Sequence, residues 1–197
     1  MAEVSGTEGY AAAAEALAAQ YESIGFDDVH GGWRHLLPAP PARVVDIGAG
    51  TGRDAAALAA LGHAVLAVEP TAAFRRIGTK LHPGLTWLDD SLPALARLAG
   101  RFDLVLLSAV WMHLDRAERR LAMPRLAGLL PPGGRLLLSL RHGPVPAGRR
   151  MFAVGADETL ALAIAAGLRP VFHQDQQPSQ FGQPGVSWTR LGLAAEA

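Results

Sequence analysis

Hydrophobic residues form short runs from residue 43 onward, and segments with the apolar spacing of a helix separate these runs. The run Leu104 to Leu107 is continuous, which is typical of a strand buried on both faces of a parallel sheet. Predicted strands span Arg43 to Ile47, His63 to Val68, Leu85 to Leu88, Phe102 to Leu107, Arg135 to Leu140, Leu168 to Phe172 and Val186 to Leu193. Predicted helices span Thr7 to Ile24, Arg53 to Leu61, Ala72 to Leu81, Pro93 to Leu98, Arg116 to Leu129 and Ala156 to Ala166. This alternation predicts an α/β fold with a doubly wound, mostly parallel sheet.

Three details refine these boundaries. Gly25 is a plausible end for the first helix, and residues 30–35 are expected to form a loop or short turn. Thr71 is a reasonable N-cap, and Pro124 is expected to kink or break its helix. Only residues 173–185 separate the last two predicted strands, so an antiparallel hairpin is favoured over a crossover.

Length and composition narrow the class of protein. The 197 residues suit a single domain, with an N-terminal helical segment and connector over 1–42 and the core over 43–197. Half of the residues are hydrophobic, and the formal net charge is zero, which argues against non-specific nucleic-acid binding. The chain has no cysteine, so it offers no disulfide, thiolate metal site or cysteine nucleophile, and no metal site is predicted.

The N-terminus predicts no targeting or membrane segment. It lacks a basic stretch followed by an apolar one, and the alanine-rich stretches are too short to span a bilayer. A cytoplasmic protein with no membrane partner is therefore expected.

The most informative motif is the run from Asp46 to Gly52, in which three alternate glycines follow an apolar strand and open a helix. Such a turn allows a ligand to approach the backbone closely at a helix N-terminus, although it can also be a tight turn with no ligand. A dinucleotide-binding loop has the spacing G-x-G-x-x-G. Here the third glycine comes one residue early, Arg53 occupies the usual glycine position, and Asp46 would repel a pyrophosphate. A cationic ligand without phosphate, such as S-adenosylmethionine, suits this loop better.

Hydrogen-bond acceptors for the rest of such a ligand follow later strands. Glu69 ends the second strand, where its carboxylate can accept from both ribose hydroxyls. Asp89 to Pro93 follow the third strand and offer a carboxylate to the adenine amine, and Ser108 follows the fourth. Carboxyl ends of parallel strands are where doubly wound sheets bind ligands.

Together these motifs resemble those of class I S-adenosylmethionine-dependent methyltransferases that act on small molecules. The resemblance covers roughly residues 43–193 and is carried by Asp46 to Gly52, Val68 to Pro70, Asp89 to Pro93, Phe102 to Ser108 and Leu130 to Leu138. It implies the strand order 3-2-1-4-5-7-6 with strand 7 antiparallel. It also implies that residues 7–37 form a lid over cofactor and acceptor.

The resemblance implies a cofactor site formed by residues at these strand ends. Its members would be Asp46, Gly48, Ala49, Gly50, Gly52, Glu69, Pro70, Asp89, Asp90, Ser91, Leu92 and Ser108. The family usually places the adenine-binding acid directly after the strand, which favours Asp89 over Asp90.

Candidate acceptor-binding residues follow the fourth and fifth predicted strands or lie in the N-terminal segment. They are Tyr21, Trp33, Trp111, His113, Arg141 and His142. His113 and His142 are also the candidate general bases, which a hydroxyl acceptor would need. Trp111 can equally pack beneath the next helix, His113 can help to begin it, and Arg141 and His142 can be parts of a solvated loop. The polar segment 174–183 either contacts the acceptor or is a mobile hairpin. His30 and His35 belong, with Tyr21 and Trp33, to the expected lid.

The predicted function is methyl transfer from S-adenosylmethionine to oxygen or nitrogen of a small molecule, by in-line displacement, with S-adenosylhomocysteine as product. Cytosine C5 methylation by the usual route needs a cysteine. Adenine or amide N-methylation in the family uses Asn-Pro-Pro-Tyr, where this chain has Ser108-Ala109-Val110-Trp111. No nucleic-acid partner is expected, and the chain is predicted to be a monomer or homodimer. The alternatives are a non-catalytic S-adenosylmethionine-binding protein, a partner subunit of an active methyltransferase, or a nicotinamide oxidoreductase.

Overall fold

Seven strands form one sheet in the order β3-β2-β1-β4-β5-β7-β6 in the computed structural model, which describes residues 4–196. The strands are β1 (Arg43–Ile47), β2 (Ala64–Val68), β3 (Thr86–Leu88), β4 (Leu104–Leu107), β5 (Arg135–His142), β6 (Leu168–Pro178) and β7 (Ser187–Ala195). The first five strands pair in parallel, and β7 is antiparallel to both β5 and β6. The predicted fold class and strand order are confirmed. Residues 1–3 and 197 of the predicted single domain lie outside the described part.

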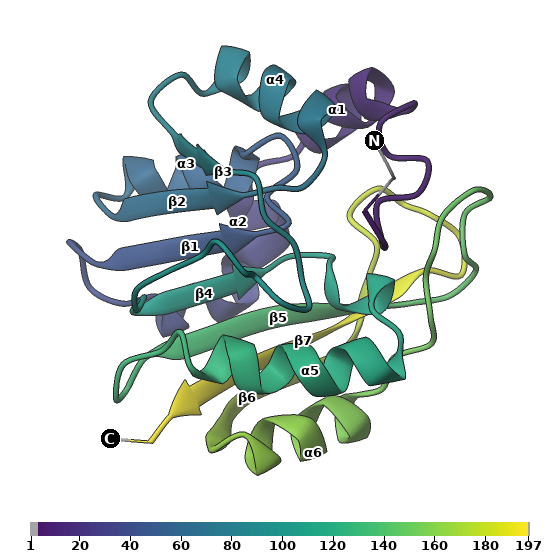
Figure 1. Cartoon of the computed structure of the whole chain (residues 1–197). Helices are drawn as coiled ribbons and strands as arrows, with labels where there is room; N and C mark the ends of the chain where they lie inside the picture. Colours follow the sequence, from purple (N-terminus) through teal and green to yellow (C-terminus); the bar gives the residue numbers. More distant parts are fainter. Residues whose placement is uncertain (1–3, 197) are drawn as a thin grey trace.

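Helices cover both faces of this sheet (Figure 1). They are α1 (Ala14–Tyr21), α2 (Phe26–His30), α3 (Arg53–Ala60), α4 (Ala72–Leu81), α5 (Arg116–Ala127) and α6 (Ala156–Ala165), with 3₁₀ helices η1 (Gly31–Leu36) and η2 (Trp111–His113). One core cluster packs beneath α5 and α6, and a second joins η1 and α3 to β1, β4 and β5. Pro124 lies inside α5 and does not break it. Among residues 4–196, no helix is long and apolar enough to cross a membrane.

The N-terminal segment differs from the prediction in two places. Helix α1 begins only at Ala14, because Gly9 has a φ of 73° and the chain before the helix forms successive turns. Residues 30–35, predicted as a loop or short turn, belong to the end of α2 and to the 3₁₀ helix η1. Phe26, His30 and Trp33 recur at helical spacing and are buried, and the Asp28 carboxylate accepts the Gly25 amide at 2.8 Å, which caps the first turn of α2.

Residues 93–98 form turns and not the predicted helix. The Asp90 carboxylate accepts the amides of Arg97 and Leu98, each at 2.8 Å. The Arg125 guanidinium donates to the carbonyls of Leu95 and Leu98. Side chains therefore satisfy backbone groups that a helix would have paired with one another.

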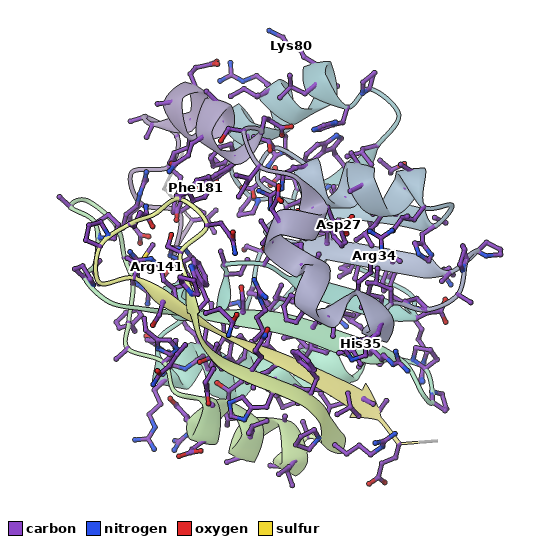
Figure 2. All side chains as sticks on the ribbon, turned by 180° about the vertical axis from the view of Figure 1, so that it is seen from behind. Asp27, Arg34, His35, Lys80, Arg141 and Phe181 are labelled. Atoms are coloured by element: carbon purple, nitrogen blue, oxygen red, sulfur yellow. The ribbon has the colours of Figure 1, made fainter. Side chains whose placement is uncertain are left out.

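Strand β5 continues two residues beyond its predicted end, to His142. Side chains alternate between the faces of a strand, so Arg141 and His142 lie on opposite faces. Strand β6 likewise extends to Pro178, and half of the segment predicted as a loop over 174–183 is strand. Because Ser187 pairs with His142, the β6–β7 loop lies beyond the end of β5. Figure 2 shows Phe181 of this loop on the same side of the molecule as Arg141.

Candidate functional site

A cavity of about 410 Å³ lies at the carboxyl ends of β1, β2, β4 and β5. It includes the point where the strand order reverses between β1 and β4, the usual ligand site of a doubly wound sheet. Residues from the N-terminal segment close one side, and the β6–β7 loop closes another. Predicted cofactor residues that line the cavity are Asp46, Gly48, Ala49, Gly50, Glu69, Pro70, Asp90, Ser91, Leu92 and Ser108.

The glycines of the first turn have different surroundings. A methyl group added at Gly50 would point toward the cavity, with the Tyr21 ring 3.7 Å away as its nearest contact. A methyl group added at Gly52 would lie 2.9 Å from Trp87 and Leu85, and Gly52 does not line the cavity. Both residues have positive φ values, 57° at Gly50 and 87° at Gly52. Gly50 therefore gives room to a ligand, and Gly52 gives room to the protein core.

Glu69 follows β2 and is 5% exposed. Its carboxylate accepts the Gly50 amide at 2.9 Å and the Thr71 amide at 2.7 Å, so it connects the glycine turn to the start of α4. Burial raises the pKa of Glu69, and these two amides oppose that shift. Thr71 occupies the N-cap position of α4 as predicted, although its side chain makes no capping hydrogen bond there.

Asp46 is a buried carboxylate in β1, one residue before the strand ends at Ile47. Asp46 is 1% exposed and lines the cavity, and its buried Oδ2 has no hydrogen-bond partner among residues 4–196. Burial and the nearby Asp54 raise the pKa of Asp46 well above its ordinary value. A cationic ligand group in the cavity would relieve both effects, because it would supply a donor and a compensating charge.

A buried ion network lies beside Asp46. His30 Nε2 contacts the Asp54 carboxylate at 2.7 Å, and Arg53 contacts its other oxygen at 2.7 Å. Burial alone would raise the pKa of Asp54, but His30 and Arg53 lower it to about 2. Arg53 also donates to the carbonyl of Tyr21, which ties the N-terminal segment to the glycine turn.

The two acids after β3 point to different places. The Asp89 carboxylate receives two hydrogen bonds from Arg75, at 3.0 and 2.7 Å, and lies outside the cavity. Asp90 lines the cavity, with its carboxylate holding the turn over residues 91–98. The structure therefore makes Asp90 the adenine-side candidate, in place of the favoured Asp89.

Tyr10 and His113 form a hydrogen-bonded pair in the lining of the cavity. His113 Nδ1 donates to the Arg150 carbonyl at 2.8 Å, which leaves Nε2 to accept from the Tyr10 hydroxyl at 3.0 Å. Burial lowers the pKa of His113 and raises the pKa of Tyr10 above its ordinary range. The pair is therefore a neutral imidazole with a phenol as donor.

The other predicted acceptor residues divide into two groups. Tyr21, Trp33 and Arg141 line the cavity, whereas Trp111 and His142 do not. Trp111 is fully buried and donates to Thr159 at 3.2 Å beneath α6. His142 Nε2 contacts the Thr189 hydroxyl at 2.9 Å on the opposite face of β5.

Several cavity residues were not among the predicted site residues. They include Tyr10, Phe74, Asp54, Arg149 and Arg190. The position of Asp54 in the sequence could have indicated a role in the site, since Asp54 lies in the first turn of the helix that follows the glycines. His30 reaches the cavity and His35 does not; His35 packs against Phe172 at the far end of η1 (Figure 2).

Part of the chain is similar in sequence to known methyltransferases. Residues 44–134 match a family model described as a methyltransferase domain. An uncharacterized methyltransferase of Mycobacterium tuberculosis is 35% identical over 101 residues, which are 51% of this chain and 40% of that protein. The chain thus spans less than half the length of that relative.

Two solved structures share the fold at low sequence identity. A TehB-like S-adenosylmethionine-dependent methyltransferase from Corynebacterium glutamicum has a TM-score of 0.70 at 20% identity, over 94% of this chain and 99% of that one. The 1,6-didemethyltoxoflavin-N1-methyltransferase of Burkholderia thailandensis, solved with 1,6-didemethyltoxoflavin and S-adenosylhomocysteine bound, has a TM-score of 0.68 at 21% identity, over 100% and 93%.

Proposed function

We propose that this chain is a class I S-adenosylmethionine-dependent methyltransferase and that it transfers the cofactor's methyl group to oxygen or nitrogen of a small molecule. The family match over residues 44–134 and the strand order support this proposal. One observation carries the proposal. The carboxylates of Asp46 and Glu69 line a single cavity with the glycine turn, and one Asp46 oxygen there has no partner.

The residues present fit S-adenosylmethionine. Asp46 offers a carboxylate to a cationic group, and Glu69 offers one to the ribose hydroxyls. Gly50 leaves space beside the backbone, and Asp90, Ser91 and Leu92 line the adenine side. When bound, the cofactor supplies a methyl group on a positively charged sulfur.

The chain's main contribution is to position the reactants and exclude water. Orientation of this kind can lower a barrier by about 7–11 kcal/mol. The N-terminal segment lines the cavity through Tyr10, Tyr21 and Trp33, and we propose that it is the lid. Tyr10 donates to His113 across the lid boundary, so this hydrogen bond helps to hold the segment closed.

Ligand preference tests the proposal. Calorimetry is expected to show binding of S-adenosylhomocysteine and no comparable binding of NAD. Preferential NAD binding would contradict the proposal in favour of a nicotinamide oxidoreductase.

Turnover separates catalysis from binding alone. Incubation with methyl-labelled S-adenosylmethionine and a fractionated metabolite extract is expected to give a labelled product. Cofactor binding without any labelled product would favour a non-catalytic binding protein or a partner subunit.

The neutral Tyr10–His113 pair predicts a pH dependence for a hydroxyl acceptor. His113 Nε2 already accepts from Tyr10, so the proton of the methyl acceptor would pass to the Tyr10 oxygen as the Tyr10 proton passes to Nε2. His113 must be unprotonated for this transfer, and burial lowers its pKa below the ordinary value. Once a hydroxyl acceptor is identified, kcat/KM is expected to fall only as the pH drops through this lowered pKa.

His113→Gln is expected to lower kcat by about 10²–10⁴-fold and to remove the decrease of kcat/KM at low pH. His142→Gln, the matched control outside the cavity, is expected to keep both. An unchanged profile in His113→Gln would show that His113 is not the base.

A further inference from the structure

The pairing of β5 with β7 sets four polar or aromatic side chains on one face of the sheet. Ser139 lies opposite Arg190, and Arg141 lies opposite Trp188. Ser139 and Arg141 are two residues apart, so they share a face, and all four residues line the cavity. On the same face, toward the other end of the strands, Leu137 packs with Trp33 and Leu36. Arg141 and Arg190 thus lie on the sheet face that η1 covers, just beyond the part that η1 covers.

Three arginines of this part of the cavity have no acidic partner. Among residues 4–196, no carboxylate oxygen lies within 4.0 Å of the guanidinium nitrogens of Arg141, Arg149 or Arg190. Arg141 donates to the Pro144 carbonyl at 2.9 Å, and Arg190 donates to the Gln174 amide oxygen at 3.2 Å. Arg149 donates to the Glu8 carbonyl at 3.3 Å and lies over the Tyr10 ring.

The lack of a countercharge is costly at Arg190, which is only 8% exposed. Burial lowers the pKa of both Arg190 and Arg141, which is the sign of a desolvated cation without compensation. Buried charges in proteins are usually paired. A guanidinium also matches carboxylate and phosphate groups with parallel hydrogen bonds.

Charge divides the cavity into two halves. The acidic half comes from β1, β2 and the turn after β3, and it contains Asp46, Glu69 and Asp90. Arg53 lines the cavity beside Asp46 as well, but it is paired with Asp54 at 2.7 Å. The basic half comes from β5, β7 and the segment after β5. The acidic half suits the cofactor's cationic and hydroxyl groups, so the basic half faces the molecule that receives the methyl group.

We propose, on the premise of the proposed function, that the methyl acceptor is an anion whose carboxylate or phosphate group binds Arg141 and Arg190. Trp188 and Met151 line the same part of the cavity and offer apolar surface to the body of the molecule. Phe181 lines the cavity from the β6–β7 loop, on the side where Figure 2 shows Arg141. Arg149 adds a third positive charge beside Tyr10.

Four small probes of similar shape and different charge test this proposal. They are benzoate, phenyl phosphate, neutral benzamide and cationic benzylamine. Each is titrated by ligand-observed NMR into protein saturated with S-adenosylhomocysteine, whose binding is first measured by calorimetry. At least one anion is expected to bind more tightly than benzamide, and benzylamine is expected to bind most weakly. Preference for benzoate identifies a carboxylate, and preference for phenyl phosphate identifies a phosphate.

Substitutions locate the binding. Arg141→Gln is expected to weaken binding of the preferred anion about tenfold or more, as is Arg190→Gln, with little change for benzamide. Arg141 is half-buried with a single backbone partner, so its variant is expected to fold even if the Arg190 variant does not. Arg169→Gln, at an exposed arginine of β6 outside the cavity, is the matched control and is expected to bind like the wild type.

The outcomes separate this inference from the proposed function. Equal binding of anions and benzamide overturns the inference, as does an Arg141 variant that binds the anion like the wild type. Loss of S-adenosylhomocysteine affinity in that variant, with anion binding intact, would assign the arginines to the cofactor and also overturn it. Failure of the wild type to bind S-adenosylhomocysteine would instead contradict the proposed function.

Discussion

Glu69→Ala is expected to weaken S-adenosylhomocysteine binding by about 1–3 kcal/mol, which is roughly 5- to 150-fold in Kd. The substitution removes the buried carboxylate proposed to accept from the ribose hydroxyls. It also removes the acceptor of the Gly50 and Thr71 amides, so the glycine turn loses its connection to α4. Isothermal titration calorimetry on the purified variant measures the effect.

Two further variants separate binding from folding. Glu69→Gln keeps one acceptor oxygen and the side-chain shape, so its affinity is expected to fall between those of the wild type and Glu69→Ala. Asp89→Ala removes an acid that pairs with Arg75 outside the cavity, and it is expected to leave the affinity unchanged. A folded Glu69→Ala protein with wild-type affinity would contradict the ribose assignment.

The sequence predicts the sheet well because its signals are local. Apolar runs mark buried strands, and the absence of a helix between the last two strands indicates a hairpin. The residues at the carboxyl ends of β1, β2 and β4 can also be predicted from the sequence, since the carboxyl end of a parallel strand follows directly from the strand itself. Asp46, Glu69 and Ser108 are therefore expected at one edge of the sheet from their positions in the chain, and all three line the same cavity.

The sequence does not predict which residues reach the cavity where this depends on the length or register of a strand. Arg141 and His142 were both expected at the rim, but β5 extends through them and alternation sends only Arg141 into the cavity. Arg190 reaches the cavity because β7 pairs with β5 in a register that the sequence does not reveal. Asp89 and Asp90 are neighbours, and their roles depend on partners at Arg75 and Arg97, distant from the motif.

The N-terminal segment shows the limit of local signals most clearly. The spacing of Phe26, His30 and Trp33 is helical, but it lies in a stretch rich in glycine and polar residues. Tyr10 enters the site through a hydrogen bond to His113, a residue 103 positions later in the chain. No pattern within the segment itself indicates that partner.

Gly52→Ala is expected to lower the free energy of unfolding by about 2–5 kcal/mol. About 1–2 kcal/mol comes from the left-handed backbone that an L-residue must adopt, and about 1–3 kcal/mol from overpacking. The added methyl group would lie 2.9 Å from the Trp87 ring. The Trp87 ring has little room to move, because the same two ring atoms also pack over Gly78, where an added methyl group would approach within 2.4 Å. Urea denaturation measures the loss.

Gly50→Ala is the matched substitution, since Gly50 has the same backbone handedness and belongs to the same turn. Its added methyl group meets nothing closer than Tyr21 at 3.7 Å, so only the backbone cost of about 1–2 kcal/mol is expected. The methyl group enters the cavity, however, and Gly50→Ala is expected to lose S-adenosylhomocysteine affinity, measured by calorimetry on the folded variant. Folded Gly50→Ala with wild-type affinity would place the cofactor away from this turn. Equal destabilisation by the two substitutions would show that Trp87 yields to the added methyl group. The paired result therefore distinguishes a glycine that the fold needs from a glycine that the ligand needs.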